Sequence, residues 1–119
     1  MKYVDGFVLP VPKKNAAKYK KAATLAGKVW KEHGALAYFE CVGDDVKPGK
    51  STSFPQAVKL KAGEVPWFSW IVYPSKKERT RINKAVMKDP RILGMMDSMK
   101  DIMDAKRMIY GGFKVVLEM

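Results

Sequence analysis

The sequence contains few of the side chains on which catalytic and metal sites most often depend. It has one cysteine, Cys41, and one histidine, His33, among 119 residues. A single cysteine cannot form an internal disulfide or a cysteine-based metal site, which agrees with a reducing compartment such as the cytoplasm. Metal-ligand spacings, phosphate-binding and dinucleotide-binding glycine motifs and a serine triad are also missing. We therefore expect no metal and no organic cofactor, and we predict a cytoplasmic location.

Long apolar segments are missing as well. No run approaches the roughly 18 residues that span a bilayer, and Asp5 interrupts the only apolar stretch near the N-terminus, so we expect neither a signal peptide nor membrane association. The composition, 47% hydrophobic and 29% charged, is that of a globular protein. A chain of this length predicts one domain, residues 1–119.

Proline and glycine divide the chain into extended and helical segments. Apolar residues recur with helical spacing in two long segments, and branched and aromatic residues cluster in four others. Ser75 and Glu78 form a capping box at the start of the second long helix. The expected elements are strands at 2–9, 35–42, 65–73 and 108–117, helices at 13–33 and from 75 onward, and shorter helices near 55–61 and after Asp89-Pro90. This β-α-β-β-α-β order predicts an α+β, ferredoxin-like subunit with a four-stranded antiparallel sheet and helices on one face.

Alternation along the strands separates two sets of side chains, one for each face of the sheet. The nearly pure apolar set is predicted to lie under the helices, and it comprises Val4, Gly6, Val8, Ala37, Phe39, Cys41, Phe68, Trp70, Val72, Ile109, Phe113, Val115 and Leu117. The other set, aromatic with a few ionisable groups, is predicted to form the outer face, and it comprises Tyr3, Asp5, Phe7, Leu9, Tyr38, Glu40, Val42, Trp67, Ser69, Ile71, Tyr73, Tyr110, Lys114 and Val116. Because exposed aromatic patches are usually covered, this face indicates either a base-stacking platform or a homodimer joined through its sheets around a partly polar cavity.

A scarcity of acidic residues gives the chain its net charge of +11, from 23 Lys and Arg against 12 Asp and Glu. Such a charge suggests nucleic acid, acidic membranes or acidic proteins as partners. The strand at 65–73 lacks the basic and glycine-aromatic pattern of an RNA-binding strand, and the lysines of the first helix are predicted to lie on its outer side. Nucleic-acid binding is therefore expected only as a non-specific, salt-sensitive effect.

Two carboxylates and one imidazole are the candidate catalytic groups. Burial of Asp5 and Glu40 on the outer face would raise their pKa toward values useful for acid/base chemistry, although they can also be a hydrogen-bonded pair at a dimer contact. His33 can move protons or simply compensate the dipole at the end of its helix. Arg79 and Arg107 are candidates for binding an anion, against an interpretation as solvated surface charge. The predicted pocket or interface residues are Tyr3, Phe7, Tyr38, Trp67, Ser69, Tyr110 and Lys114.

Four sequence blocks carry a family resemblance. They are YVDGFVLPVPK, KVWKEHGALAYFECVGDD, WFSWIVYPSK and KRMIYGGF, and together they resemble the YbaA-like family, a domain of unknown function (1428). The resemblance implies a dimeric α/β barrel with a cavity between sheet and helices in each subunit, and no established reaction. Wider relatives include cofactor-independent monooxygenases and haem-degrading enzymes. The Asn, Trp and His pattern of the latter is not matched, because Asp5 takes the first-strand polar position and His33 ends the first helix.

These observations predict a homodimer that binds a small organic molecule of aromatic or hydrophobic character. The same pocket can belong to a cofactor-independent enzyme of a monooxygenase-like or isomerase-like kind. The alternatives are a non-catalytic structural or stress-associated dimer and, less favoured, a basic nucleic-acid-binding protein.

Overall fold

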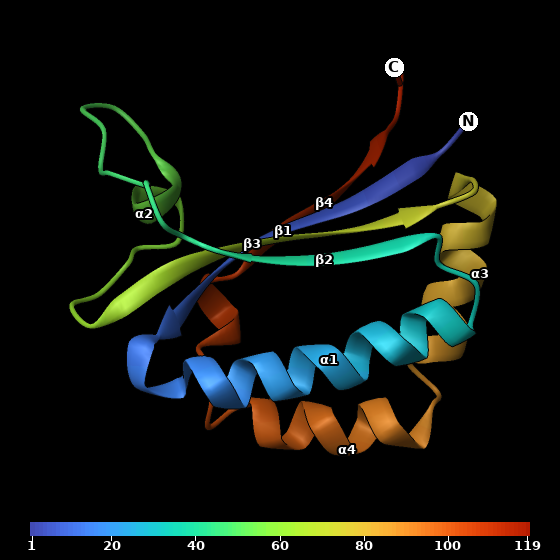
Figure 1. Cartoon of the computed structure of the whole chain (residues 1–119), viewed down its shortest axis with the longest axis horizontal. Coiled ribbons are helices and arrows are strands. Elements are labelled where there is room, and N and C mark those ends of the chain that lie inside the picture. The colour runs from blue at the N-terminus through green and yellow to red at the C-terminus, as the bar shows by residue number, and fades with distance from the viewer.

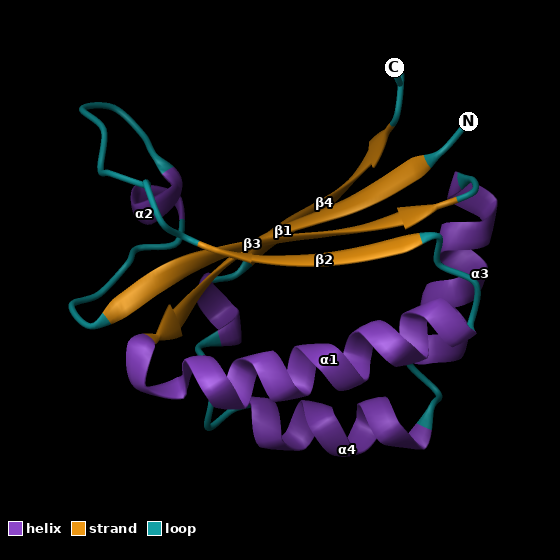
Figure 2. Ribbon diagram, viewed as in Figure 1, coloured by secondary structure: helices purple, strands orange, loops and turns teal.

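The computed structural model describes residues 1–119 and consists of one four-stranded antiparallel sheet with helices packed against it (Figures 1 and 2). The strands are β1 (Tyr3–Pro12), β2 (Ala37–Val42), β3 (Glu64–Tyr73) and β4 (Ile109–Lys114), and the helices are α1 (Ala16–Glu32), α2 (Phe54–Ala57), α3 (Lys76–Val86) and α4 (Pro90–Met99). The sheet order is β2-β3-β1-β4. The predicted α+β, ferredoxin-like class is confirmed. None of the helices has the length and apolar character that crossing a membrane requires.

Helix boundaries follow local hydrogen-bonding groups. The Oγ of Ser75 accepts a hydrogen bond from the Glu78 N–H at the start of α3, and the Asp89 carboxylate accepts one from the Arg91 N–H at the start of α4. Each bond satisfies a donor that has no partner within its helix. Gly34 follows α1 with a φ of +119°, a left-handed conformation that disfavours any residue with a Cβ. The starts of α3 and α4 and the end of α1 therefore agree with the sequence pattern.

Strand β1 continues through Pro10 and Pro12, beyond the predicted end at residue 9. Proline was expected to end the strand because it has no N–H to donate. The register explains the difference, since Pro10 lies opposite Pro66 of β3 and the Pro66 carbonyl is turned to the other side, where it accepts from the Gly43 N–H at 2.8 Å. β4 pairs with β1 only as far as Val8. Pro10 and Pro12 therefore direct their nitrogens away from β3, toward a part of β1 that β4 does not reach, and neither removes a ladder hydrogen bond.

The two faces of the sheet are assigned the opposite way to the prediction. Tyr3 and Tyr73, from the set expected outside, are buried against the helices. Phe39 and Phe113, from the set expected inside, are 46% and 63% exposed. Figure 1 shows α1, α3 and α4 on one side of the sheet and only α2 with its loop on the other. We call these sides the helix face and the open face. The predicted burial of Cys41 is wrong for the same reason, because it lies exposed on the open face.

Aromatic rings gather on the open face. Phe39 stacks on Trp70 with ring centroids 4.6 Å apart, and Phe68 packs against Trp70 at 5.5 Å. Phe54 of α2 contacts Phe68 edge-on at 5.9 Å, so α2 covers one end of this face. The rest forms an apolar surface with no element of the chain above it. Alternation identifies the two sets of residues, but both carry enough apolar area to pack against helices, and it does not indicate which set does so.

Candidate functional site

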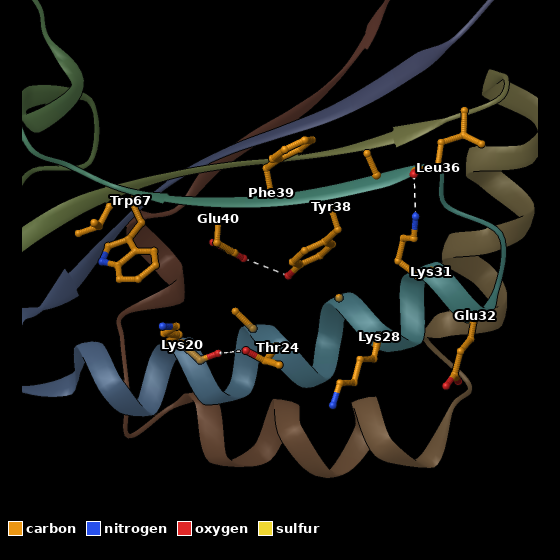
Figure 3. A pocket seen from close by; sticks show the side chains of 14 residues that line it. Lys20, Thr24, Lys28, Lys31, Glu32, Leu36, Tyr38, Phe39, Glu40 and Trp67 are labelled. Carbon is orange, nitrogen blue, oxygen red and sulfur yellow. Dashed lines mark hydrogen bonds between the residues drawn. The ribbon is translucent and has the colours of Figure 1, made fainter.

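A groove of about 890 Å³ lies between α1 and the edge strand β2 (Figure 3). Because β2 is the outermost strand, its free edge stands directly beside the helix. Residues at helical spacing line one side, and alternate residues of β2 line the other. The residues that matter below are Lys20, Gly27, Lys28 and Lys31 from α1, Tyr38 and Glu40 from β2, and Trp67 from β3.

Glu40 lies half-buried at the floor of this groove, held by two tyrosines. The Tyr19 hydroxyl donates to its Oε1 at 2.9 Å and the Tyr38 hydroxyl donates to its Oε2 at 3.0 Å. Burial raises the pKa of Glu40, and the two hydrogen bonds oppose that shift only in part. Burial also raises the pKa of Tyr19 and of Tyr38, so both hydroxyls remain protonated donors. The result is a carboxylate with neutral partners and a raised proton affinity.

Gly27 allows Tyr38 to reach Glu40. A Cβ at position 27 would lie 2.9 Å from the Tyr38 ring, so the ring can rest against α1 only where the side chain is absent. Glycine inside a helix costs about 1 kcal/mol relative to alanine. That cost is offset here by the contact with Tyr38, which Trp30 flanks at 6.2 Å between ring centroids.

Trp67 closes the end of the groove near Tyr19, whose ring it meets edge-on at 4.8 Å. Its Nε1 is buried without a hydrogen-bond partner, at a typical cost of about 1–3 kcal/mol. Figure 3 shows this nitrogen turned away from Glu40. The indole therefore acts on the groove as an apolar wall and not as a donor to the carboxylate.

Asp5 belongs to a second, separate polar network on the helix face. Arg79 contacts its Oδ1 through Nη2 at 2.9 Å and through Nε at 3.0 Å. The Tyr73 hydroxyl and the Asn83 Nδ2 donate to its Oδ2 at 3.0 and 3.1 Å. Trp30 Nε1 donates to Asn83 Oδ1 at 3.0 Å. This network ties β1, β3, α1 and α3 together and leaves both oxygens of Asp5 fully engaged.

The two candidate carboxylates do not form a pair. β3 lies between their strands, with Asp5 opposite Ile71 and Glu40 opposite Ser69. Two interstrand spacings, about 9–10 Å, therefore separate the two backbones. Asp5 and Glu40 cannot share a proton, and only Glu40 faces a groove.

The remaining predicted site residues lie elsewhere. His33 caps α1, where its Nε2 is 3.2 Å from Asp89 Oδ2, and it does not line the groove. Arg107 pairs with Glu64 at 2.6 Å and with Asp104 at 3.0 Å. Like Arg79, it has no free charge for an external anion. No three His, Cys, Asp or Glu side chains come together as a metal-binding group.

The predicted pocket residues divide between groove, core and surface. Tyr38 and Trp67 line the groove, whereas Tyr3 and Ser69 are buried in the helix face. Phe7 is partly buried in the core and stacks on Tyr110 at 6.1 Å, and Tyr110 and Lys114 lie exposed on β4. The sequence interpretation missed Tyr19, Gly27 and the groove lysines. A tyrosine and a glycine interrupting the alanine-rich apolar stripe of α1 were the available signal.

Comparisons with known proteins agree with this architecture. Residues 2–105 match the family model described as "Protein of unknown function (DUF1428)". The chain is 47% identical over 118 residues to "Uncharacterized protein YbaA" of Escherichia coli K12, with 99% of each chain covered, and equally similar to the protein of that name from Shigella flexneri.

Solved structures with little sequence identity share the fold. A putative antibiotic biosynthesis monooxygenase from Nitrosomonas europaea superposes with a TM-score of 0.60 at 13% identity, covering 97% of this chain and 90% of that one. SnoaB, a cofactor-independent oxygenase from Streptomyces nogalater, gives 0.58 at 10%, covering 98% and 95%. A NIPSNAP domain protein from Burkholderia xenovorans gives 0.61 at 8%, covering 98% of each. On the strength of its family match and of its full-length relatives, the chain belongs to the DUF1428 family of proteins of unknown function.

Proposed function

We propose that this protein binds a small aromatic or hydrophobic organic molecule in the groove between α1 and β2, and that Glu40 moves a proton on that molecule. The observation that carries the proposal is a half-buried carboxylate at the groove floor, bonded by the neutral hydroxyls of Tyr19 and Tyr38 and raised in pKa by burial. Each carboxylate oxygen has a second lone pair, so a ligand can approach without displacing either tyrosine.

The proposed chemistry needs no more than one base. A Glu40 oxygen removes a proton from an acidic C–H or O–H of the ligand, and the electron pair stays on the ligand as an enolate or phenolate. Return of the proton to a different atom gives an isomerisation. Reaction of the anion with O₂, which is then the oxidant, gives an oxygenation, the class that the name of one structural neighbour records. Fold likeness alone does not assign either outcome.

We also propose that the protein is a cytoplasmic homodimer joined through its open face. Exposed aromatic rings at Phe39, Phe68 and Phe113 support this surface, because monomers seldom leave such a patch in water. It is the opposite face to the one first predicted. Trp70→Glu places a charge at the centre of the ring cluster, and sedimentation should then give monomers; a monomeric wild type at micromolar concentration contradicts the dimer.

The proposed reaction is tested by solvent exchange. Aromatic ketones and phenols that raise the melting temperature are incubated with the protein in D₂O, and NMR follows deuterium entering their acidic C–H positions. Glu40→Gln should keep binding and lose exchange, while Glu78→Gln, which changes a surface carboxylate outside the groove, is the folded control. Binding with equal exchange in the wild type and in Glu40→Gln refutes the role of Glu40. If no compound binds, the non-catalytic dimer becomes the better interpretation, and the closed Asp5 network already favours a structural role for that part of the molecule.

A further inference from the structure

The free edge of β2 presents backbone groups that nothing in the chain uses. Gly43 N–H bonds to the Pro66 carbonyl just past the end of β2. Hydrogen-bonding residues alternate along an antiparallel ladder, so Ala37, Phe39 and Cys41 bond toward β3. The residues between them, Tyr38, Glu40 and Val42, direct their N–H and C=O groups outward. None of these outward groups bonds to another element.

A lysine closes the end of the β2 edge that lies nearest the C-terminus of α1. Lys31 Nζ donates to the Leu36 carbonyl at 2.8 Å, which marks where the open part begins. An exposed, partly apolar edge of this kind is a template for another strand, and proteins usually protect it. Here the only neighbour along its length is α1, which Figure 3 shows running beside β2 across the groove.

Unpaired positive charge follows the edge on the α1 side. Lys20 and Lys28 line the groove and, like Lys31, take part in no ion pair. The acidic groups nearby are already engaged, since Glu32 is held by Arg91 at 2.7 Å and Glu40 by the two tyrosines. Across the 11 positions from Lys20 to Lys31, α1 advances about 16 Å. Five residues of strand also advance about 16 Å, so the lysines extend along the full length of a five-residue strand at this edge.

We infer that the β2 edge binds an extended acidic peptide segment of a partner protein, which adds to the sheet as an antiparallel strand. Side chains of the added strand alternate between the two faces. Those opposite Tyr38, Glu40 and Val42 lie on the helix face. There the lysines favour Asp or Glu opposite Tyr38 and Val42, whereas the Glu40 carboxylate, held by neutral hydroxyls, favours an uncharged polar residue opposite itself. Those between them lie beside Phe39 and Cys41 on the open face, which favours apolar residues. The expected recognition pattern is acidic-apolar-polar-apolar-acidic, a form of β-strand addition. This goes beyond the proposed chemistry of the groove and does not depend on it.

The first test measures, by fluorescence anisotropy, the binding of a labelled peptide of about seven residues with Glu-Val-Gln-Val-Glu at its centre. The peptide in which Lys replaces Glu should bind at least about tenfold more weakly. Lys20→Glu combined with Lys28→Glu should weaken binding of the acidic peptide by about tenfold or more. Lys18→Glu combined with Lys21→Glu, on the same helix but away from the groove, makes the same charge change and should weaken it far less. Equal losses in both double variants overturn the assignment of the site.

N-methylation distinguishes strand addition from simple charge attraction. In an antiparallel strand, the residues opposite Glu40 and its alternate neighbours direct their amides at β2. Methylating the backbone N–H groups of the peptide's Glu and Gln residues should abolish binding, and methylating those of its Val residues should leave binding within about threefold. Binding that survives both substitutions overturns strand addition. Residues 116–119 follow β4, at the edge of the sheet opposite to β2. Binding that appears only after they are removed therefore means that the C-terminal residues of a second copy cover the β2 edge, and that outcome overturns the acidic-partner inference.

Discussion

Two buried or half-buried carboxylates lie on the same face of the same sheet and differ in what surrounds them. Asp5 meets a guanidinium, an amide and a phenol, and helices cover it. Glu40 meets two phenols and opens on a groove. A carboxylate with a cation and all lone pairs engaged stabilises a fold but has little capacity left for a ligand. A carboxylate held by neutral donors keeps both a raised proton affinity and room to use it.

Removing Arg79, the cation that pairs with Asp5, is expected to change the stability of the protein most. Arg79→Ala leaves Asp5 buried without a countercharge, and we expect the free energy of unfolding to fall by about 3 kcal/mol. Urea denaturation at pH 7 measures it. Arg81→Ala is the matched control, because Arg81 pairs with Glu78 at the surface and should cost less than about 1 kcal/mol. Similar losses in the two variants contradict the structural role of the Asp5 network.

Removing one tyrosine hydroxyl from each carboxylate site compares how much the two sites contribute to stability. Tyr73→Phe removes a donor to the paired Asp5 and should cost about 2 kcal/mol, because hydrogen bonds to buried charges are the strong ones. Tyr38→Phe removes a donor to Glu40 at the edge of the groove and should cost about 1 kcal/mol. If the order is reversed, Glu40 and not Asp5 is the carboxylate on which the fold depends.

Two glycine-to-alanine substitutions test the packing that positions Tyr38. Gly27→Ala pushes a methyl group into the Tyr38 ring, and the clash should outweigh the gain in helix propensity, for a net loss of about 1 kcal/mol. Gly94→Ala in α4 meets nothing within 4 Å and should stabilise by up to about 1 kcal/mol. Thermal unfolding of both variants gives the difference directly. Two stabilising substitutions would mean that Tyr38 moves aside freely.

The smallest effect is the pH dependence of Glu40. Since the folded state holds this proton more tightly than the unfolded chain, wild-type stability relative to Glu40→Gln should rise as pH falls from above the folded pKa toward the ordinary value of 4.5. At neutral pH the two proteins should differ by less than about 1 kcal/mol. Parallel stability curves from pH 4 to 8 would show that burial does not shift this carboxyl.

The order of elements was predictable from the sequence, whereas the partners of the polar residues were not. Ser75, Asp89 and Gly34 act through bonds within a few residues, so the local pattern contains the information. Glu40 depends on Tyr19, and Asp5 on Arg79, across separations of 21 and 74 residues. Such contacts are set by which face of the sheet the helices cover, and alternation alone does not decide that.

A better indication of the covered face was present on α3. Arg79, Ile82, Asn83 and Val86 recur at intervals of three and four, so two polar groups share a stripe with two apolar ones. A helix of this kind packs most favourably on a sheet face that offers a matching carboxylate. Only the set containing Asp5 provides one, and the sequence interpretation weighed the apolar purity of each set instead.

Pro66 has a consequence for motion. It accepts a hydrogen bond from the Gly43 N–H but has no N–H to return, so one backbone bond instead of two joins the chain just after β2 to β3 at this point. Deuterium uptake at neighbouring amides should therefore report a local opening at lower free energy than in the middle of the sheet. The segment that carries α2 leaves the sheet beside Pro66. We therefore expect its mobility to depend on this end of the sheet, where backbone hydrogen bonds are few.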